Sequence, residues 1–461
     1  MSATVKTNGI RKPRNFPLYK TLPGFIRNPL KEIEHIGRVA DGDLARLDLG
    51  ASKPLIATHP DHVQKVLRNS GDYVRAGTFW RPLHGLMGDG ILGEGELWAL
   101  SRRSLQPLFT TRNVNTLVGR MAETIDEAVG ELDGPARDRR PVSASAAMIR
   151  IVNRTVLRVF FGEKVSPAEI ERLGPAFEAV ATKLVFRFLL PFVPEAVPMP
   201  GDRAYRRGVQ IMDEVMYGLV ERYRDDPGPG EDIFTALCRA RTEQGHTEQG
   251  HEVSGRWIRD NLVAMFATST ETTSTALTWL WPTLESHPDV ARRLYDEIEQ
   301  VTQGKSVTAE HLPQLAYTRQ VVQELLRLYP VGWLFPRVAR RPDSIGGVPI
   351  KAGQSVLISP YLTHRLPSVW DRPLVFDPDR FAPGRGADRH RYAYFPFGGG
   401  QHQCIGMHVF NLEAQLVIAS ILSRYRPELR GFTAPAAPRI GATIRPSQDP
   451  KLILHPLDRV R

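Results

Sequence analysis

Phe395-Pro-Phe-Gly-Gly-Gly-Gln-His-Gln-Cys-Ile-Gly406 is the stretch that decides the fold. From Phe397 onward it has the form Phe-x-x-Gly-x-His-x-Cys-x-Gly, which average residue frequencies would produce by chance in roughly one chain in ten thousand. The glycines Gly398 to Gly400 let the backbone turn tightly and approach a flat group closely. A lone cysteine is more often a small buried apolar residue. These fixed neighbours instead favour Cys404 as a metal-bound thiolate.

The chain on either side of Cys404 also suits an anionic sulfur. A helix is predicted to begin just after Cys404 and to run to about Ser423, which places the positive end of its dipole near the thiolate. Backbone N–H groups of the loop can hydrogen-bond to the sulfur, and such bonds tune the potential of a bound iron. His402 can donate a hydrogen bond to a carboxylate of the cofactor.

Composition limits the class of protein. The chain has 461 residues, 42% of them hydrophobic and 24% charged, which is an ordinary globular balance. The net charge of +10 suggests an acidic partner, but the basic residues are scattered, so nucleic-acid binding is not expected. Two cysteines fit a reducing cytoplasm. Because residues 1–30 hold no stretch of signal-peptide type and the most apolar run, Leu184 to Pro194, is too short for a membrane span, we expect a cytoplasmic protein without a membrane anchor.

The hydrophobic pattern is mainly helical. The longest helix is predicted from about Ser254 to Ser286, roughly 50 Å at the α-helical rise, with a kink at Pro282 and an end before Pro288. Other predicted helices start at Pro60 or cover 289–303 and 316–329, and short strands are predicted at 43–49, 54–58, 347–350 and 355–358. Residues 1–20 are predicted to form a loose arm. No linker divides residues 21–461, so we expect one domain, mainly α with a small β part.

A polar stretch interrupts the middle of this longest helix, Thr268-Ser-Thr-Glu-Thr-Thr-Ser-Thr275. Hydroxyl residues are poor helix formers, and a glutamate inside a buried helix is costly to desolvate. In one interpretation the hydroxyls bond back to carbonyls one turn earlier and Glu271 is solvated at the edge. In the other, the stretch forms a groove that delivers protons to a bound oxygen molecule.

The cysteine loop resembles the haem-binding signature of the cytochrome P450 family, in which the cysteine, here Cys404, is the axial ligand of haem b. The resemblance implies the family's fold, a helix-rich prism with the haem between a long central helix and the Cys-ligand loop. Many members carry arginine where this chain has His402, which resembles the soluble bacterial members. The polar stretch resembles the family's (Ala/Gly)-Gly-x-(Asp/Glu)-Thr-(Thr/Ser), which implies Glu271 as the acid and Thr272 as the threonine of the oxygen pocket. Thr268-Ser269 departs from this pattern, and a side chain at Ser269 narrows the space where the helix normally opens.

A structural network is implied by two further segments. Glu324-Leu-Leu-Arg327 resembles the family's ExxR helix, and Phe376-Asp-Pro-Asp-Arg-Phe381 resembles the segment whose arginine, here Arg380, joins that pair. Such a buried Glu–Arg–Arg network would hold the loop behind the haem. Without the resemblance, the Glu324–Arg327 pair would be an ordinary surface ion pair.

Three residues are implied to bind the haem propionates. Trp98 and Arg102 are four apart and share a helix face. They resemble the family's WxxxR pair, although on their own they could be core packing and a surface charge. Arg337 falls where members often place another propionate-binding arginine, and Phe397 and Gly398 begin the loop that lies against the haem. Guanidinium groups suit carboxylates because they form charge-assisted hydrogen bonds.

The resemblance implies a monooxygenase that uses two electrons and two protons to cleave O₂ and returns a hydroxyl group to a substrate carbon. A separate ferredoxin and ferredoxin reductase are expected as electron donors, steered by a basic face on the cysteine side. The expected substrate is a hydrophobic small molecule, such as a terpenoid or polyketide intermediate. Leu184 to Pro194 would be an apolar lid and Phe79, Trp80, Leu83 and Leu86 an apolar loop, although both segments can equally be ordinary core.

Other functions stay open at this point. A haem-thiolate binding or sensor protein, or a peroxygenase, would share Cys404 but would need no proton relay. A cysteine hydrolase would pair Cys404 with His402, but two residues so close on a glycine-rich loop give a poor nucleophile–base geometry.

Overall fold

The computed structural model of the chain describes residues 11–50, 52–78, 80–81, 87–162, 164–166, 168–169, 172–176, 179–180, 197, 201–223, 232–248, 250, 253–431, 436–441 and 443–457. The chain forms two compact units, each assembled from three separate stretches. The first, which we call the sheet unit, contains residues 1–80, 327–376 and 386–404. The second, the helical unit, contains residues 81–326, 377–385 and 405–461. Each unit therefore depends on chain segments that are far apart in sequence.

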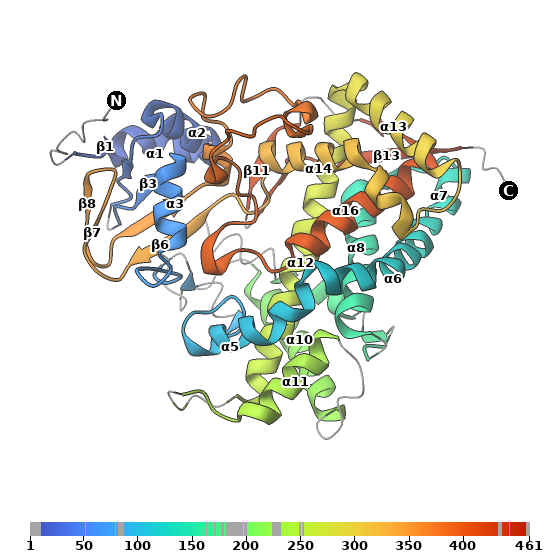
Figure 1. The fold of residues 1–461 in the computed structure, drawn as a ribbon, viewed down its shortest axis with the longest axis horizontal. Helices are drawn as coiled ribbons and strands as arrows, with labels where there is room; N and C mark the ends of the chain where they lie inside the picture. The colour runs from blue at the N-terminus through green and yellow to red at the C-terminus, as the bar shows by residue number, and fades with distance from the viewer. Residues whose placement is uncertain are drawn as a thin grey trace. The chain divides into compact units, whose positions relative to one another are not determined.

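A six-stranded sheet organises the sheet unit, in the order β1-β2-β3-β9-β6-β4. Its strands β1, β3 and β6 are labelled in Figure 1. Its strands are β1 (Arg14–Phe16), β2 (Ala45–Leu47), β3 (Leu55–Ala57), β4 (Tyr73–Val74), β6 (Phe335–Ala339) and β9 (Ser355–Ile358). β2 and β3 lie within the strands predicted at 43–49 and 54–58, and they pair with each other antiparallel. The parallel pairing of β3 with β9 joins the N-terminal part of the unit to residues 300 positions later.

The predicted loose arm differs from the structure in its second half. Arg14–Phe16 pairs in parallel with Ala45–Leu47, and the helix α1 begins at Leu18. Residues 1–10 lie outside the described residues. Hydrogen bonds to a sheet edge hold a polar terminal segment in place without any apolar periodicity in it.

Helices and a small ribbon complete the sheet unit. They are α1 (Leu18–Arg27), α2 (Pro29–Ala40), α3 (Pro60–Arg68), α15 (Pro360–Thr363), the short helices η4 (Arg391–Ala393) and η5 (Gly400–His402), and the ribbon of β7 (Asp343–Ile345) with β8 (Val348–Ile350). The core of the unit contains Val63 and Val66 of α3, residues of β3 and β9, and Tyr392 and Phe395. The segment that leads into the cysteine loop is thus packed in the same core as α3.

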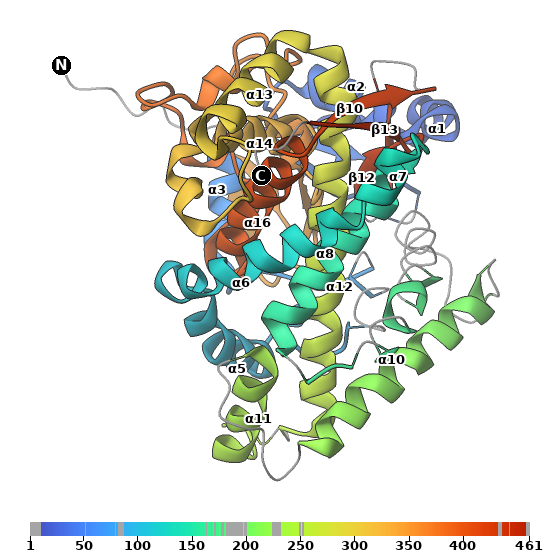
Figure 2. The same cartoon turned by 90° about the vertical axis from the view of Figure 1, so that its right-hand side faces the viewer.

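The helical unit is built around α12 (Gly255–Ser286), a 32-residue helix that includes Pro282 and ends before Pro288, as predicted. Figures 1 and 2 show α12 beside α8 and α16. Among the described residues, the other helices of the unit include α5 (Glu96–Leu105), α6 (Thr111–Gly130), α7 (Asp133–Arg137), α8 (Ala144–Phe161), α10 (Asp202–Arg222), α11 (Ile233–Gln244), α13 (Pro288–Thr302), α14 (Ala316–Leu328, whose last two residues belong to the sheet unit), α16 (Met407–Leu422) and the short η1 (Gln106–Phe109), η2 (Ala309–Gln314) and η3 (Pro378–Phe381).

Short strands close the helical unit near its C-terminal end. They are β5 (Val142–Ser143), β10 (Tyr425–Arg430), β11 (Pro438–Ile440), β12 (Ile444–Pro446) and β13 (Lys451–Pro456). β13 pairs with β10 and β5, and β11 and β12 form an antiparallel hairpin. Trp279 of α12 donates its indole N–H to the Ile444 carbonyl at 2.9 Å, and both residues are fully buried. This bond fixes the hairpin against the central helix.

One described stretch has the length and apolarity of a membrane span, Gly400–Leu422. Its most apolar window is 67% buried inside the protein. Most of the stretch is α16, whose residues from Val409 to Leu422 are almost all buried. Its apolar character is that of a core helix.

Candidate functional site

The cysteine loop of the sheet unit exposes a thiol. Cys404 is exposed, and its backbone N–H donates to the Phe397 carbonyl at 2.9 Å, which closes the loop. Gly398 has a positive φ of 70°, a conformation that side chains disfavour, and its N–H donates to the Phe395 carbonyl. The predicted glycine-rich turn therefore forms as a closed loop with the sulfur at its surface.

Gly400 seats this loop on α3. A Cβ built at Gly400 would lie 1.9 Å from the backbone carbonyl oxygen of Leu67, near the end of α3, and the φ of Gly400 is also positive. A Cβ at Gly399 would meet the Tyr392 ring at 2.6 Å. Only glycine permits these two approaches, which explains why the motif needs a run of glycines as well as a tight turn.

Cationic side chains gather next to this loop within the sheet unit. His402 contacts the Arg75 guanidinium through its Nδ1 atom. The guanidinium groups of Arg75 and Arg337 lie 5.7 and 6.0 Å from the centre of the Trp80 ring. Trp80 in turn donates its indole N–H to the Pro336 carbonyl at 2.9 Å. Arg337, 5% exposed, and His402 were both predicted site residues, and the structure brings them together through Arg75 and Trp80.

Arg75 is a site residue that sequence reasoning missed. It follows β4 as an isolated arginine, and no spacing in the sequence links it to His402, 327 positions later. Trp80 was predicted only as part of an apolar substrate loop. Its companions Phe79, Leu83 and Leu86 lie outside the described residues, as does Leu184–Pro194.

Arg327 braces the segment that leads to the cysteine loop. Its guanidinium donates to the carbonyls of His364, Pro373 and Val375, at 2.8, 2.7 and 3.0 Å. His364, fully buried, accepts the backbone N–H of Phe395 on Nε2 at 3.0 Å. The ExxR arginine therefore reaches the first residue of the loop through one histidine.

Glu324 and Arg380 form an ion pair in the helical unit, with 3.4 Å between Arg380 Nε and Glu324 Oε1. Both side chains are buried, and Glu324 also accepts the backbone N–H of Asp377 at 2.8 Å. Of the network predicted for Glu324, Arg327 and Arg380, the structure shows this pair and the separate carbonyl contacts of Arg327. Backbone carbonyl and N–H groups thus contribute to satisfying these buried charges.

Trp98 and Arg102 lie one turn apart on α5 and are half-buried. The helix is held to α12 by Trp257, whose indole N–H donates to the Leu97 carbonyl and the Ser101 hydroxyl, at 3.2 and 3.0 Å. The predicted helix for this pair is present in the helical unit, and its position on α12 is fixed by buried hydrogen bonds.

The hydroxyl groups of the polar stretch of α12 bond back within the helix. The hydroxyls of Thr268, Thr272 and Ser274 donate to the carbonyls of Ala264, Thr268 and Thr270, one turn earlier, as the simpler interpretation predicted. The Thr272 hydroxyl hydrogen is thereby committed, and its oxygen lone pairs can accept a hydrogen bond.

Glu271 is held by side chains and is only 19% exposed, which the simpler interpretation did not predict. Its Oε1 atom accepts hydrogen bonds from the Thr443 hydroxyl at 2.8 Å and from the Arg445 guanidinium of β12. The Thr275 hydroxyl is 3.5 Å from the same oxygen. Sequence reasoning missed Thr443 and Arg445, which carry no motif.

Cys238, on α11, is the other cysteine and is buried. Burial raises the pKa of its thiol to about 11, so the thiolate form is disfavoured at neutral pH. A ligand thiolate therefore suits the exposed Cys404 better.

A scan against protein-family models matches residues 11–453 to the model described as Cytochrome P450. The chain belongs to the cytochrome P450 family. The P450 is similar, at 30% identity over 90% of the chain and 88% of the relative, to a protein of Streptomyces melanosporofaciens named cyclooctat-9-en-7-ol 5-monooxygenase. It is 29% identical, over 87% of each chain, to the pentalenene oxygenase of Streptomyces avermitilis. Its fold matches the crystal structure of the cytochrome P450DA haem domain with a TM-score of 0.81, at 22% identity and covering 97% of this chain and 98% of that one.

Membership gives the reaction class and the cofactor. The protein is a haem-dependent monooxygenase of the P450 type, with the haem iron held by a cysteine thiolate. This finding overturns the cysteine hydrolase hypothesis. The predicted fold class, mainly α with a small β part, is also confirmed.

The residues of the sheet unit fit this cofactor. Cys404 offers an exposed thiol on a loop whose glycines leave the backbone free of side chains. Arg75, Arg337 and His402 supply nitrogen donors of the kind that bind carboxylates. Among the described residues, no three His, Cys, Asp or Glu side chains group as a metal site. A single thiolate is what a haem requires from the protein on that side.

Proposed function

We propose that Cys404 is the axial thiolate ligand of haem b and that the protein hydroxylates a hydrophobic small molecule with one atom of O₂. The observation that carries this proposal is the exposed Cys404 thiol on its closed loop, whereas Cys238 is buried and the pKa of its thiol is raised. When bound, haem supplies the activation of O₂. The residues of the chain hold the cofactor, orient the substrate and deliver protons.

Binding of the haem propionates is assigned to two groups of residues. Arg75, Arg337 and His402 serve in the sheet unit, where the shared contact with Trp80 holds both guanidinium groups. Trp98 and Arg102 of α5 serve in the helical unit, as the family resemblance implies. Charge-assisted hydrogen bonds make such contacts about twice as strong as neutral ones.

Proton delivery is assigned to Glu271 and Thr272 on α12. The Thr272 hydroxyl donates to the Thr268 carbonyl, so its oxygen is oriented as an acceptor. Glu271 is the preceding residue on α12, and 19% of its side chain is exposed to solvent. A carboxylate in that position can take a proton from water and pass it to the Thr272 hydroxyl.

The substrate class is assigned as terpenoid. Two relatives with about 30% identity are named for terpenoid substrates, cyclooctat-9-en-7-ol and pentalenene. Titration of the ferric protein with cyclic terpene hydrocarbons and alcohols tests this assignment. A saturable shift of the Soret band with these compounds, and none with macrolide polyketides of similar size, is the expected result. The opposite preference would reject the terpenoid class and leave the haem assignment standing.

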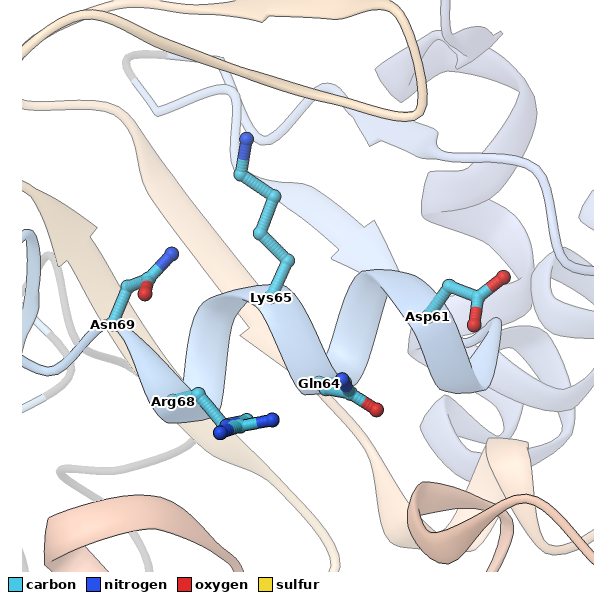
Figure 3. A pocket seen from close by; sticks show the side chains of 5 residues that line it. All are labelled: Asp61, Gln64, Lys65, Arg68 and Asn69. Carbon is cyan, nitrogen blue, oxygen red and sulfur yellow. The ribbon is translucent and has the colours of Figure 1, made fainter. Parts of the chain in front are cut away.

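The role of electron donor is assigned to a separate acidic ferredoxin, which its own reductase reduces. Beside the cysteine loop, α3 presents a shallow surface pocket lined by Asp61, Gln64, Lys65, Arg68 and Asn69 (Figure 3). Arg68 and Gln64 point to one side of the helix and Lys65 to the other. Lys65 is paired with Asp343, whereas Arg68 makes no ion pair with any described residue. An exposed arginine one residue from the Leu67 carbonyl, on which Gly400 sits, suits docking of an acidic donor.

A cytoplasmic location fits this assignment. Neither cysteine forms a disulfide with a described residue, and the one described stretch with the apolarity of a span is mostly buried in the protein. Ferredoxin-type donors also work in the reducing compartment that free thiols require.

A further inference from the structure

The carboxylate of Glu271 is fixed from outside its own helix, by the hairpin of β11 and β12. Thr443, 5% exposed, donates to Glu271 Oε1 at 2.8 Å, and the Arg445 guanidinium donates to the same oxygen. No described residue bonds the other oxygen, Oε2. The contacts of the carboxylate are therefore one-sided, and its second oxygen is the one available to other partners.

The hairpin itself is anchored independently of this carboxylate. The Trp279–Ile444 hydrogen bond is fully buried, and the strands keep the register Ile440 to Ile444 and Arg439 to Arg445. Loss of the contact between Arg445 and Glu271 should therefore loosen the hairpin locally without detaching it from α12.

The ion pair is also weak enough to open. The Arg445 side chain is 45% exposed, and ion pairs exposed to this extent contribute little to stability. Glu271 must leave this contact, at least briefly, to carry a proton.

We propose that Arg445 and Thr443 are positioning residues that restrain Glu271 and thereby limit the rate at which it delivers protons. This inference rests on the proposed role of Glu271 in the monooxygenase. In the restrained position the carboxylate contacts Thr443 and Arg445 of the hairpin. When Arg445 releases the carboxylate, Oε2 takes a proton from water at the exposed side. The carboxyl group then turns and passes the proton to the Thr272 hydroxyl, which regenerates the carboxylate.

Arg445→Gln and Arg445→Lys test the restraint, with Arg439→Gln as the matched control. Arg439 is the cross-strand partner of Arg445, is exposed, and makes no contact with Glu271. The holoenzyme is assayed at saturating electron donor, and turnover is measured in H₂O and D₂O. We expect Arg445→Gln to raise turnover about two- to fivefold, the range that a partly exposed ion pair permits, and to lower the solvent isotope effect. Arg445→Lys and Arg439→Gln should behave like the wild type.

Hydrogen–deuterium exchange gives a readout that does not depend on activity. The peptide covering residues 438–446 should exchange faster in Glu271→Gln and Arg445→Gln, and at the wild-type rate in Arg439→Gln. Unchanged exchange and an unchanged isotope effect in Arg445→Gln would overturn the restraint. An effect of Arg439→Gln equal to that of Arg445→Gln would also overturn it, as would a loss of turnover in Arg445→Gln.

The proposed function fails by different results. If Glu271→Gln turns over like the wild type, Glu271 is not the acid, and if the Cys404 variants keep the wild-type spectrum, the haem assignment is wrong. A failure confined to the Arg445 variants rejects only the restraint.

Discussion

Glu413 of α16 shares a side-chain hydrogen bond with Thr273 of α12, the residue after Thr272. The carboxyl group is fully buried, and burial raises its pKa to about 8 even though the bond to Thr273 acts in the opposite direction. Its Oε1 atom has no hydrogen-bond partner among the described residues. Glu413 is therefore neutral at pH 7, and it is a buried acid directly behind the polar stretch of the central helix.

The raised pKa of Glu413 predicts a pH-dependent stability. Between the unfolded value of 4.5 and the folded value of about 8, the folded state binds more protons than the unfolded state. The free energy of unfolding should therefore fall as pH rises through this range, by an amount on the order of a few kcal/mol, and level off above pH 8. Glu413→Gln should remove the slope in urea unfolding from pH 5 to 9, and the exposed Glu310→Gln should keep it. Parallel curves for wild type and Glu413→Gln would contradict the neutral assignment.

Gly400 and Gly353 offer a matched pair for the seat of the cysteine loop. Both have a positive φ, but a Cβ at Gly353 meets nothing within 4 Å, whereas one at Gly400 meets the Leu67 carbonyl at 1.9 Å. Gly353→Ala should lower the free energy of unfolding by about 1–2 kcal/mol from backbone strain alone. Gly400→Ala should cost clearly more and also reduce haem content in the purified protein. Equal costs in chemical unfolding would show that Leu67 does not constrain the loop.

Thr272 should couple electron use to product formation. Thr272→Ala removes the oriented acceptor oxygen, so reducing equivalents should continue to be consumed but end as hydrogen peroxide. We expect product per electron to fall about tenfold or more, within the range of proton-transfer catalysis. Thr272→Ser should restore most of it, and Thr278→Ala, which removes another back-bonded hydroxyl of α12, should not lower it. A Thr272→Ala enzyme with unchanged coupling would favour a peroxygenase or sensor without a relay.

Arg68 should contribute to docking of the electron donor. Arg68→Glu should slow reduction by ferredoxin about three- to tenfold at low ionic strength, and the difference should vanish in high salt because exposed charges are screened. Stopped-flow reduction under carbon monoxide measures this rate. Lys351→Glu, an equal charge change at an exposed residue after β8, is the control. A salt-independent difference, or the same effect from Lys351→Glu, would place the donor elsewhere.

Local signals in the sequence explain what could be predicted. The 3.6-residue pattern and Pro288 define α12, and the alternation at 43–49 and 54–58 defines the β2–β3 hairpin. The glycines around Cys404 predict a tight loop, although the need for Gly400 became visible only with Leu67 beside it. Signals confined to one helix or one turn are thus sufficient for these elements.

Long-range contacts explain what could not be predicted. Arg445 and Thr443 follow Glu271 by more than 170 positions, and Arg75 precedes His402 by 327. Arg14–Phe16 forms a strand because β2 offers an edge, and not because of its own pattern. Single polar residues that meet only through the fold leave no periodicity in the sequence.

The identity of the iron ligand is tested most directly by the reduced carbon-monoxide difference spectrum of the wild type beside Cys404→His and Cys238→Ser. We predict the thiolate-type Soret band that characterises the family for the wild type and for Cys238→Ser, and a band of the histidine-ligated type, or no haem, for Cys404→His. A Cys404→His protein that keeps the thiolate-type band would contradict the account.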